Sequence, residues 1–211
     1  MRRDRRSAHG ARLIAGRIAV MTLALLTYAS LPASAWAAGP QEAIQQLVAA
    51  VSAVVGDPAL QAAAKKNERR DRIGAIIHDA FDFEQMARES LGAPWAGLTA
   101  AQRSEFTRLF EDRFERSYSL LVLRFLGERT TSYGGETIQG EEARVRTALV
   151  SQKDGTLPVD YRLTAAGGRW AVADVVVDGV SLTGNYRAQF SKILRTSSYE
   201  SLLRRMRTPA E

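Results

Sequence analysis

The sequence has no cysteine and only two histidines among its 211 residues. Without cysteine the chain forms no disulfide, offers no thiol nucleophile and lacks the acylated cysteine that anchors a lipoprotein, so its stability has to come from packing. Carboxylates are then the main metal ligands left, and no run of aspartate and glutamate has the spacing of a calcium loop. We therefore expect neither a metal ion nor a cofactor.

Side chains for hydrolytic chemistry are equally scarce. His9 lies in the leader described below, and His78 stands in the helical stretch AIIHDAF, with no G-x-S-x-G motif in the chain. We interpret His78 as a helix-boundary residue bonded to solvent or backbone. Asp174 and Asp178 share a strand face, but the second lies at a turn, so they do not form the facing carboxylates of a glycosidase. The sequence predicts no enzyme.

The net charge of +6 belongs mostly to the N-terminus. Residues 1–35 run from an arginine-rich start through a largely apolar stretch of 14 residues to small residues around an A-x-A site, the order of a secretory signal peptide. The apolar stretch falls short of the ~20 residues that span a bilayer as a helix, so we expect cleavage rather than an uncleaved anchor. Removal of 1–35 leaves 23 basic and 22 acidic residues. That balance excludes a nucleic-acid protein, which would keep a phosphate-neutralising stripe.

The rest of the chain predicts one exported domain. We assign residues 36–40 to a linker, 41–207 to a single domain and 208–211 to a tail. An exported chain without cysteine fits the bacterial periplasm, where we expect a monomer.

Apolar residues recur at three- and four-residue steps over 41–55, 73–81, 82–91 and 100–125, which predicts four helices. The longest begins at a capping box formed by Thr99 and Gln102. Its continuous apolar face consists of Phe106, Leu109, Phe110, Phe114, Tyr118, Leu121, Val122 and Phe125.

From residue 130 the apolar period changes to two, which is typical of strands. Asp154-Gly155 and Gly167-Gly168 predict hairpin turns, and a helical segment over 183–206 follows the last strand. Helices packed on an antiparallel meander of about four strands, closed by C-terminal helices, predict an α+β fold.

The last predicted strand, 169–177, is apolar on both faces. Simple alternation places Trp170, Val172 and Val176 on one face, where Asp174 interrupts them and needs an arginine or amide partner. The chain then stays apolar through its turn and into the next helix, which favours the rim of a hydrophobic cavity. The alternative, that the aromatic stripe of the long helix is ordinary core, remains open.

Two blocks of the sequence are distinctive: LGAPWAGLTAAQRSEFTRLFEDRF and WAVADVVVDGVSLTGNYRAQFSKILR. Their characteristic residues are Leu91, Gly92, Trp95, Thr99, Gln102, Arg103 and Phe106, and then Trp170, Asp174, Gly179, Val180, Ser181 and Leu182. In these residues the chain resembles the MlaC family, also called toluene-tolerance auxiliary proteins. Order and spacing hold from about Asp71 to Arg207, while the first helix matches weakly.

The resemblance implies a soluble periplasmic shuttle that carries phospholipid between outer and inner membranes as part of an ABC transport system. It also implies a deep hydrophobic pocket, and as partners an inner-membrane ABC transporter complex and an outer-membrane lipoprotein complex. The stretch RSYSLLVLRFLGERT resembles the hopanoid-associated HpnM branch, whose cargo would be a polycyclic lipid. A non-enzymatic adaptor that binds a partner helix in its groove is a further alternative.

For a lipid with ~30 tail carbons we expect a cavity near ~1,000 Å³. Its expected walls are Phe110, Phe114, Tyr118 and Leu121 of the long helix, Val145, Leu149, Val159 and Tyr161 of the sheet, and Val176, Val180, Leu182, Tyr186 and Phe190 around the last turn. Ser181 either caps the following helix or contacts a head group. The C-terminal segment turns Arg195, Arg204 and Arg205 outward, as a face for acidic head groups or a partner, or as a plain solvated face.

Overall fold

The computed structural model describes residues 38–208, apart from the side chains of residues 119–128. The predicted signal peptide, residues 1–35, lies outside the described residues. The helices are α1 (Pro40–Gly56), α2 (Lys66–Ala80), α3 (Phe83–Leu91), α4 (Ala100–Glu128), α5 (Leu182–Thr196) and α6 (Tyr199–Arg207). The strands are β1 (Thr130–Gln139), β2 (Glu142–Ser151), β3 (Gly155–Ala166), β4 (Arg169–Val177) and β5 (Val180–Ser181). The predicted α+β fold is confirmed.

The helix ends follow from local side-chain chemistry. At the start of α4, the Thr99 hydroxyl accepts a hydrogen bond from the Gln102 amide at 3.3 Å, and the Gln102 side chain accepts one from the Thr99 amide at 2.9 Å. This is the predicted capping box. Asp82 caps α3 by accepting from the Gln85 amide at 2.9 Å, and α3 ends at Gly92, whose φ of 72° suits glycine.

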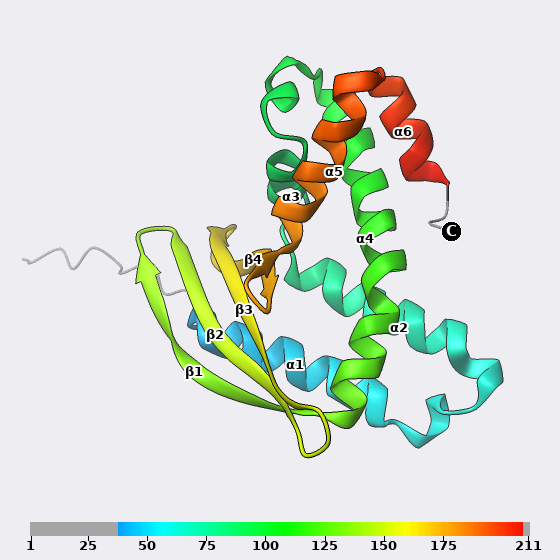
Figure 1. Ribbon diagram of the computed structural model, residues 1–211. Coiled ribbons are helices and arrows are strands. Elements are labelled where there is room, and N and C mark those ends of the chain that lie inside the picture. Colours follow the sequence, from blue (N-terminus) through cyan, green and yellow to red (C-terminus); the bar gives the residue numbers. More distant parts are fainter. Residues whose placement is uncertain (1–37, 209–211) are drawn as a thin grey trace, which may run out of the picture. The chain divides into compact units, whose positions relative to one another are not determined.

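The sheet is an antiparallel meander in the order β1-β2-β3-β4-β5 (Figure 1). Gly155 and the pair Gly167-Gly168 have positive φ at the two predicted hairpin turns. Asp178 and Gly179 make a third such turn, which folds β5 back on β4. β1 pairs with β2 along its length, with a register shift between Tyr133 and Glu136.

Helices α1, α3, α4 and α5 contact the sheet. α1 lies against β1, β2 and β4, and its first turn is fixed by the Gln41 amide, which donates to the Glu136 carboxylate at 2.6 Å (Figure 1). The junction between α2 and α3 is fixed to β4, because the Asp82 amide donates to the Val172 carbonyl at 2.9 Å. α3 packs on α4 and α5, and α6 packs on α4. One continuous cluster of buried apolar side chains joins these elements.

A bulge in β4 overturns the predicted faces of the last strand. β3 pairs Leu163 with Val172 but Arg162 with Asp174, so Ala173 is an extra residue that has no partner in the register. Trp170 and Val172 therefore share the core-facing side with Val175 and Val177 rather than with Val176. Strict alternation failed here because one inserted residue exchanges the two faces of a strand.

None of the helices in the described part of the chain combines the length and the hydropathy needed to cross a bilayer.

Candidate functional site

A cavity of about 350 Å³ lies between the inner face of the sheet and the helices that cover it. Its lining consists of Leu47, Val48, Val51, Ile77, Phe81, Phe114, Tyr118, Leu149, Leu157, Val159, Tyr161, Val175, Val177, Val180 and Leu182. Every one of these side chains is aliphatic or aromatic. The volume is at the lower end of the ~300–1,000 Å³ typical of ligand pockets and well below the predicted value.

The sheet supplies one wall because its inward positions align across three strands. Val159 pairs with Thr147 on β2 and with Val177 on β4. Tyr161 pairs with Val145 and with Val175. Side chains two residues apart on a strand point to the same face, so this register places a mainly apolar surface opposite α1 and α4. Thr147 is the polar side chain in this row, and its hydroxyl donates to the Val159 carbonyl.

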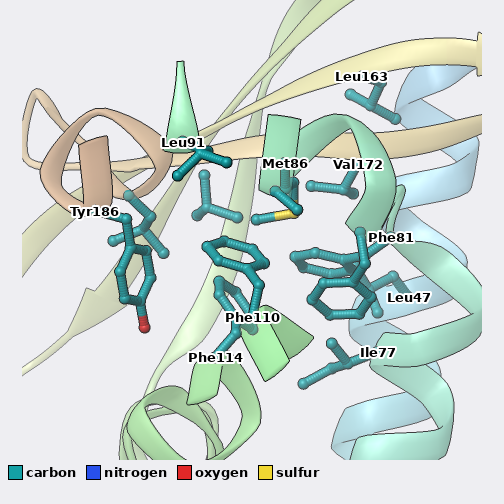
Figure 2. Close-up of a cluster of buried hydrophobic side chains, with 14 of the residues drawn as sticks. Leu47, Ile77, Phe81, Met86, Leu91, Phe110, Phe114, Leu163, Val172 and Tyr186 are labelled. Carbon is teal, nitrogen blue, oxygen red and sulfur yellow. The ribbon is translucent and has the colours of Figure 1, made fainter. Parts of the chain in front are cut away.

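Aromatic rings form the helical wall and narrow the space. The rings of Phe81, Phe83 and Phe114 form a triangle with centroids 5.6–5.7 Å apart, and Tyr118 lies 4.7 Å from Phe114. Figure 2 shows Phe81 and Phe114 converging with Leu47 and Ile77 from α1 and α2. Because these rings occupy much of the volume between the layers, the cavity is smaller than the sequence predicted.

The cavity wall carries no charge at neutral pH. Its side-chain polar atoms are the hydroxyls of Tyr118 and Tyr161. Burial raises the pKa of Tyr118 to about 12, with a smaller effect from the neighbouring Tyr186. Burial likewise raises the pKa of Tyr161 to about 12. Both phenols therefore stay neutral, and the site suits a hydrocarbon group far better than a charged one.

The structure places seven of the predicted wall residues on the cavity. They are Phe114, Tyr118, Leu149, Val159, Tyr161, Val180 and Leu182. Val180 is 57% exposed, which puts it where the cavity meets solvent. Whether these residues contact a ligand stays a prediction. Leu121 lies among the residues whose side chains are not described.

Four other predicted wall residues are buried but lie away from the cavity lining: Phe110, Val145, Tyr186 and Phe190. The Phe110 ring lies 5.1 Å from Tyr186 and 6.5 Å from Phe190, so these three rings hold α4 against α5. The aromatic face of α4 thus has two roles: Phe110 packs against α5, while Phe114 and Tyr118 line the cavity.

Val176 and Ser181 lie on a separate, polar cleft at the other face of the sheet, together with Arg144 and Arg162. Val176 is there because of the β4 bulge. The Ser181 hydroxyl donates to the Asp174 carboxylate at 2.5 Å and accepts from the Gly184 amide at 2.9 Å. Ser181 is therefore the N-cap of α5, which is one of the two roles predicted for it.

Asp174 is buried and accepts backbone bonds from the Val175 amide at 2.9 Å and the Thr183 amide at 3.0 Å. With the Ser181 hydroxyl, these donors satisfy its carboxylate and tie β4 to the start of α5. This confirms the predicted hydrogen-bonding role. His78, which was interpreted as bonded to solvent or backbone, instead forms an ion pair with the Glu111 side chain, and this pair raises the pKa of the imidazole above 6.5. Among the described residues, no group of three His, Cys, Asp or Glu side chains could hold a metal ion.

Sequence reasoning missed the contribution of α1 and α2 to the cavity. Leu47, Val48 and Val51 of α1 line it, as do Ile77 of α2 and Phe81 just beyond that helix. The amphipathic spacing of α1 showed that one face is buried, but it contained no information on what lies opposite that face. Leu157, Val175 and Val177 were also missed.

Comparison with known proteins finds a family model, a curated relative and solved structures that match this chain. A family model described as MlaC protein matches residues 45–208. The toluene tolerance protein ttg2D of Pseudomonas putida is 21% identical over 133 residues, and the match spans 59% of this chain and 59% of that relative's length. A solved phospholipid-binding protein from Ralstonia solanacearum, in complex with a phospholipid, superposes with a TM-score of 0.70. It is 21% identical, and the match covers 80% of this chain and 95% of that one, a likeness that shows the shared fold.

Proposed function

The chain belongs to the MlaC family, and from that premise we propose that it is a non-enzymatic lipid-binding carrier of the periplasm. The observation that carries the proposal is the uncharged cavity, whose lining is wholly aliphatic and aromatic. The phospholipid held by the structurally similar Ralstonia protein supports a phospholipid as the cargo.

The energetics of such a site agree with carriage. Each buried methylene contributes roughly 0.8 kcal/mol, so a single tail of about 16 carbons gains about 13 kcal/mol before the costs of ordering it. A hydrocarbon tail in this cavity faces Val159 and Val177 on one side and Phe114 on the other. The ligand's polar group would then remain at the solvent-exposed end near Val180.

We further propose the finer role that the family resemblance implies. The signal peptide, residues 1–35, would direct the chain to the periplasm. There it would shuttle phospholipid between an outer-membrane lipoprotein complex and an inner-membrane ABC transporter complex. A membrane lipid does not cross an aqueous compartment alone at a useful rate, so a protein with a dry cavity answers a physical need.

Mass spectrometry of an organic extract of the natively purified protein tests the cargo. A phospholipid in near-stoichiometric amount supports the proposal. A polycyclic lipid would assign the chain to hopanoid carriage instead, and an extract free of lipid would favour the adaptor alternative.

A pair of variants tests the cavity itself. Val180→Trp places a large ring at the exposed end of the cavity, and we expect it to lower the co-purified lipid severalfold without unfolding the protein. Ile138→Trp is the matched control, because Ile138 is also a strand residue, is 52% exposed and does not line the cavity. Equal lipid content in both variants would show that the cavity mouth is not where the ligand enters.

A further inference from the structure

The charge of the domain is divided unequally along the chain. Residues 182–208, which form α5 and α6, carry six basic side chains and one acidic one. Residues 38–181 carry 17 basic and 20 acidic side chains. Residues 38–208 together carry 23 basic and 21 acidic side chains, so a nearly neutral domain has a basic helical pair, α5 and α6, on a mildly acidic remainder.

The basic side chains of this pair are directed to solvent. The exposed ones are Arg187, Lys192, Arg195, Arg204, Arg205 and Arg207. In the described part of the chain only Arg207 of these six forms an ion pair, with Glu105 of α4. Arg204 lies close enough to Glu200 to help lower the pKa of that carboxyl. The exposed basic groups outnumber this one acidic side chain and can approach a negative surface.

The contact between α4 and α6 adds two more cations. The Arg113 side chain donates to the Arg205 carbonyl at 3.4 Å, and the Arg116 side chain donates to the Met206 carbonyl at 3.0 Å. Both guanidinium groups therefore lie at the C-terminal end of α6, beside the backbone of Arg205 and Met206. Figure 1 shows α5 and α6 as adjacent helices next to the upper part of α4.

No large hydrophobic side chain is exposed on α5 or α6. The apolar side of α6, formed by Leu202, Leu203 and Met206, is buried in the core. Among the described residues the exposed large hydrophobic side chains are Tyr133, Ile138, Val150 and Val180, and none of them belongs to α5 or α6. A specific protein interface normally has an apolar centre, so this face favours a surface that is recognised by charge alone.

We propose that the solvent faces of α5 and α6 dock the protein reversibly on a bilayer surface that carries anionic head groups. Only Leu182 of these two helices lines the cavity. Docking through the basic face therefore leaves the cavity residues uncovered while it raises the local concentration of the carrier at the membrane. Docking is separate from cargo binding and depends on different side chains.

Vesicle flotation of the full mature chain tests this proposal. We expect binding to vesicles of phosphatidylcholine mixed with phosphatidylglycerol, little binding to phosphatidylcholine alone, and a loss of binding as salt shortens the screening length. Each arginine near an anionic surface contributes about a fivefold gain in affinity, so Arg204→Gln combined with Arg205→Gln should weaken binding about 25-fold.

The matched control is Arg144→Gln combined with Arg146→Gln on β2, which removes the same charge from exposed positions outside the two helices. This control should keep the affinity of the natural sequence for anionic vesicles. Equal losses of affinity in both double variants would show that net charge alone explains the binding, and would overturn the proposal. No preference for anionic vesicles would also overturn it and leave an acidic protein as the partner for this face. Both double variants should still carry their full amount of lipid. Measuring the lipid content of the same samples therefore separates the docking result from the proposed carriage.

Discussion

Phe114→Ala separates a cavity wall from an ordinary core position. Phe114 is 3% exposed, and its ring lies 5.6 Å from Phe81, 5.6 Å from Phe83 and 4.7 Å from Tyr118. Truncating such a phenylalanine should cost about 3–5 kcal/mol of the free energy of unfolding of the lipid-free protein. For a domain of this size that loss corresponds to a fall in Tm of about 6–20 °C.

The lipid-loaded protein should lose less free energy of unfolding on Phe114→Ala than the lipid-free protein does. A hydrocarbon tail next to Phe114 can move into the vacated space. It then removes part of the free-energy cost of the empty cavity, which is up to ~2 kcal/mol for a single substitution of this kind. Lipid should therefore stabilise Phe114→Ala more than it stabilises the natural sequence. Urea denaturation of delipidated and reloaded protein measures both differences.

Phe106→Ala is the control on the same helix. Phe106 is fully buried against Trp95 at 6.2 Å and Phe190 at 5.8 Å, and it does not line the cavity. Its cost should be the same with and without lipid. If Phe114→Ala also loses the same free energy in both states, the tail does not lie against Phe114 and the proposed wall is wrong.

Two further predictions concern polar groups. Asp174→Ala removes the acceptor for the Val175 and Thr183 amides and the Ser181 hydroxyl, and should cost about 2–4 kcal/mol in urea denaturation; a loss below ~0.5 kcal/mol would contradict the assigned role. Glu111 raises the pKa of His78 above 6.5, so the ion pair contributes its stability fully below 6.5 and loses it as the pH rises through the raised pKa. The difference in Tm between the natural sequence and His78→Gln should therefore shrink toward alkaline pH, and a difference that grows instead would contradict the ion pair.

Local structure was predictable wherever neighbouring residues decide it. The capping box at Thr99 and Gln102 needs only a helix start and a spacing of three residues. The turn at Asp154-Gly155 depends on the backbone freedom of Gly155, whose φ is 76°. Ser181 could be predicted as an N-cap for the same reason, since the amide that it caps lies three residues further on.

The faces of β4 depended on more than its own residues. The sequence alternates regularly through Val172, Asp174 and Val176, and nothing in it marks Ala173 as the bulged residue. At the bulge, the register between β3 and β4 shifts by one residue. With this shift Asp174 reaches its amide donors while Val175 and Val177 face the core. Val176 was misplaced as a cavity residue for that reason.

The helices, the hairpins and the apolar character of the residues that could enclose a ligand were predictable from the sequence alone, and the export leader stays a prediction. Which of those residues enclose space and which fill it depended on how the elements pack against one another. Phe110 and Phe114 are one turn apart on one face of α4, yet the first packs on Tyr186 and the second lines the cavity. Hydrophobicity drives both side chains out of water equally, and the distance between α4 and the element opposite decides whether a space remains.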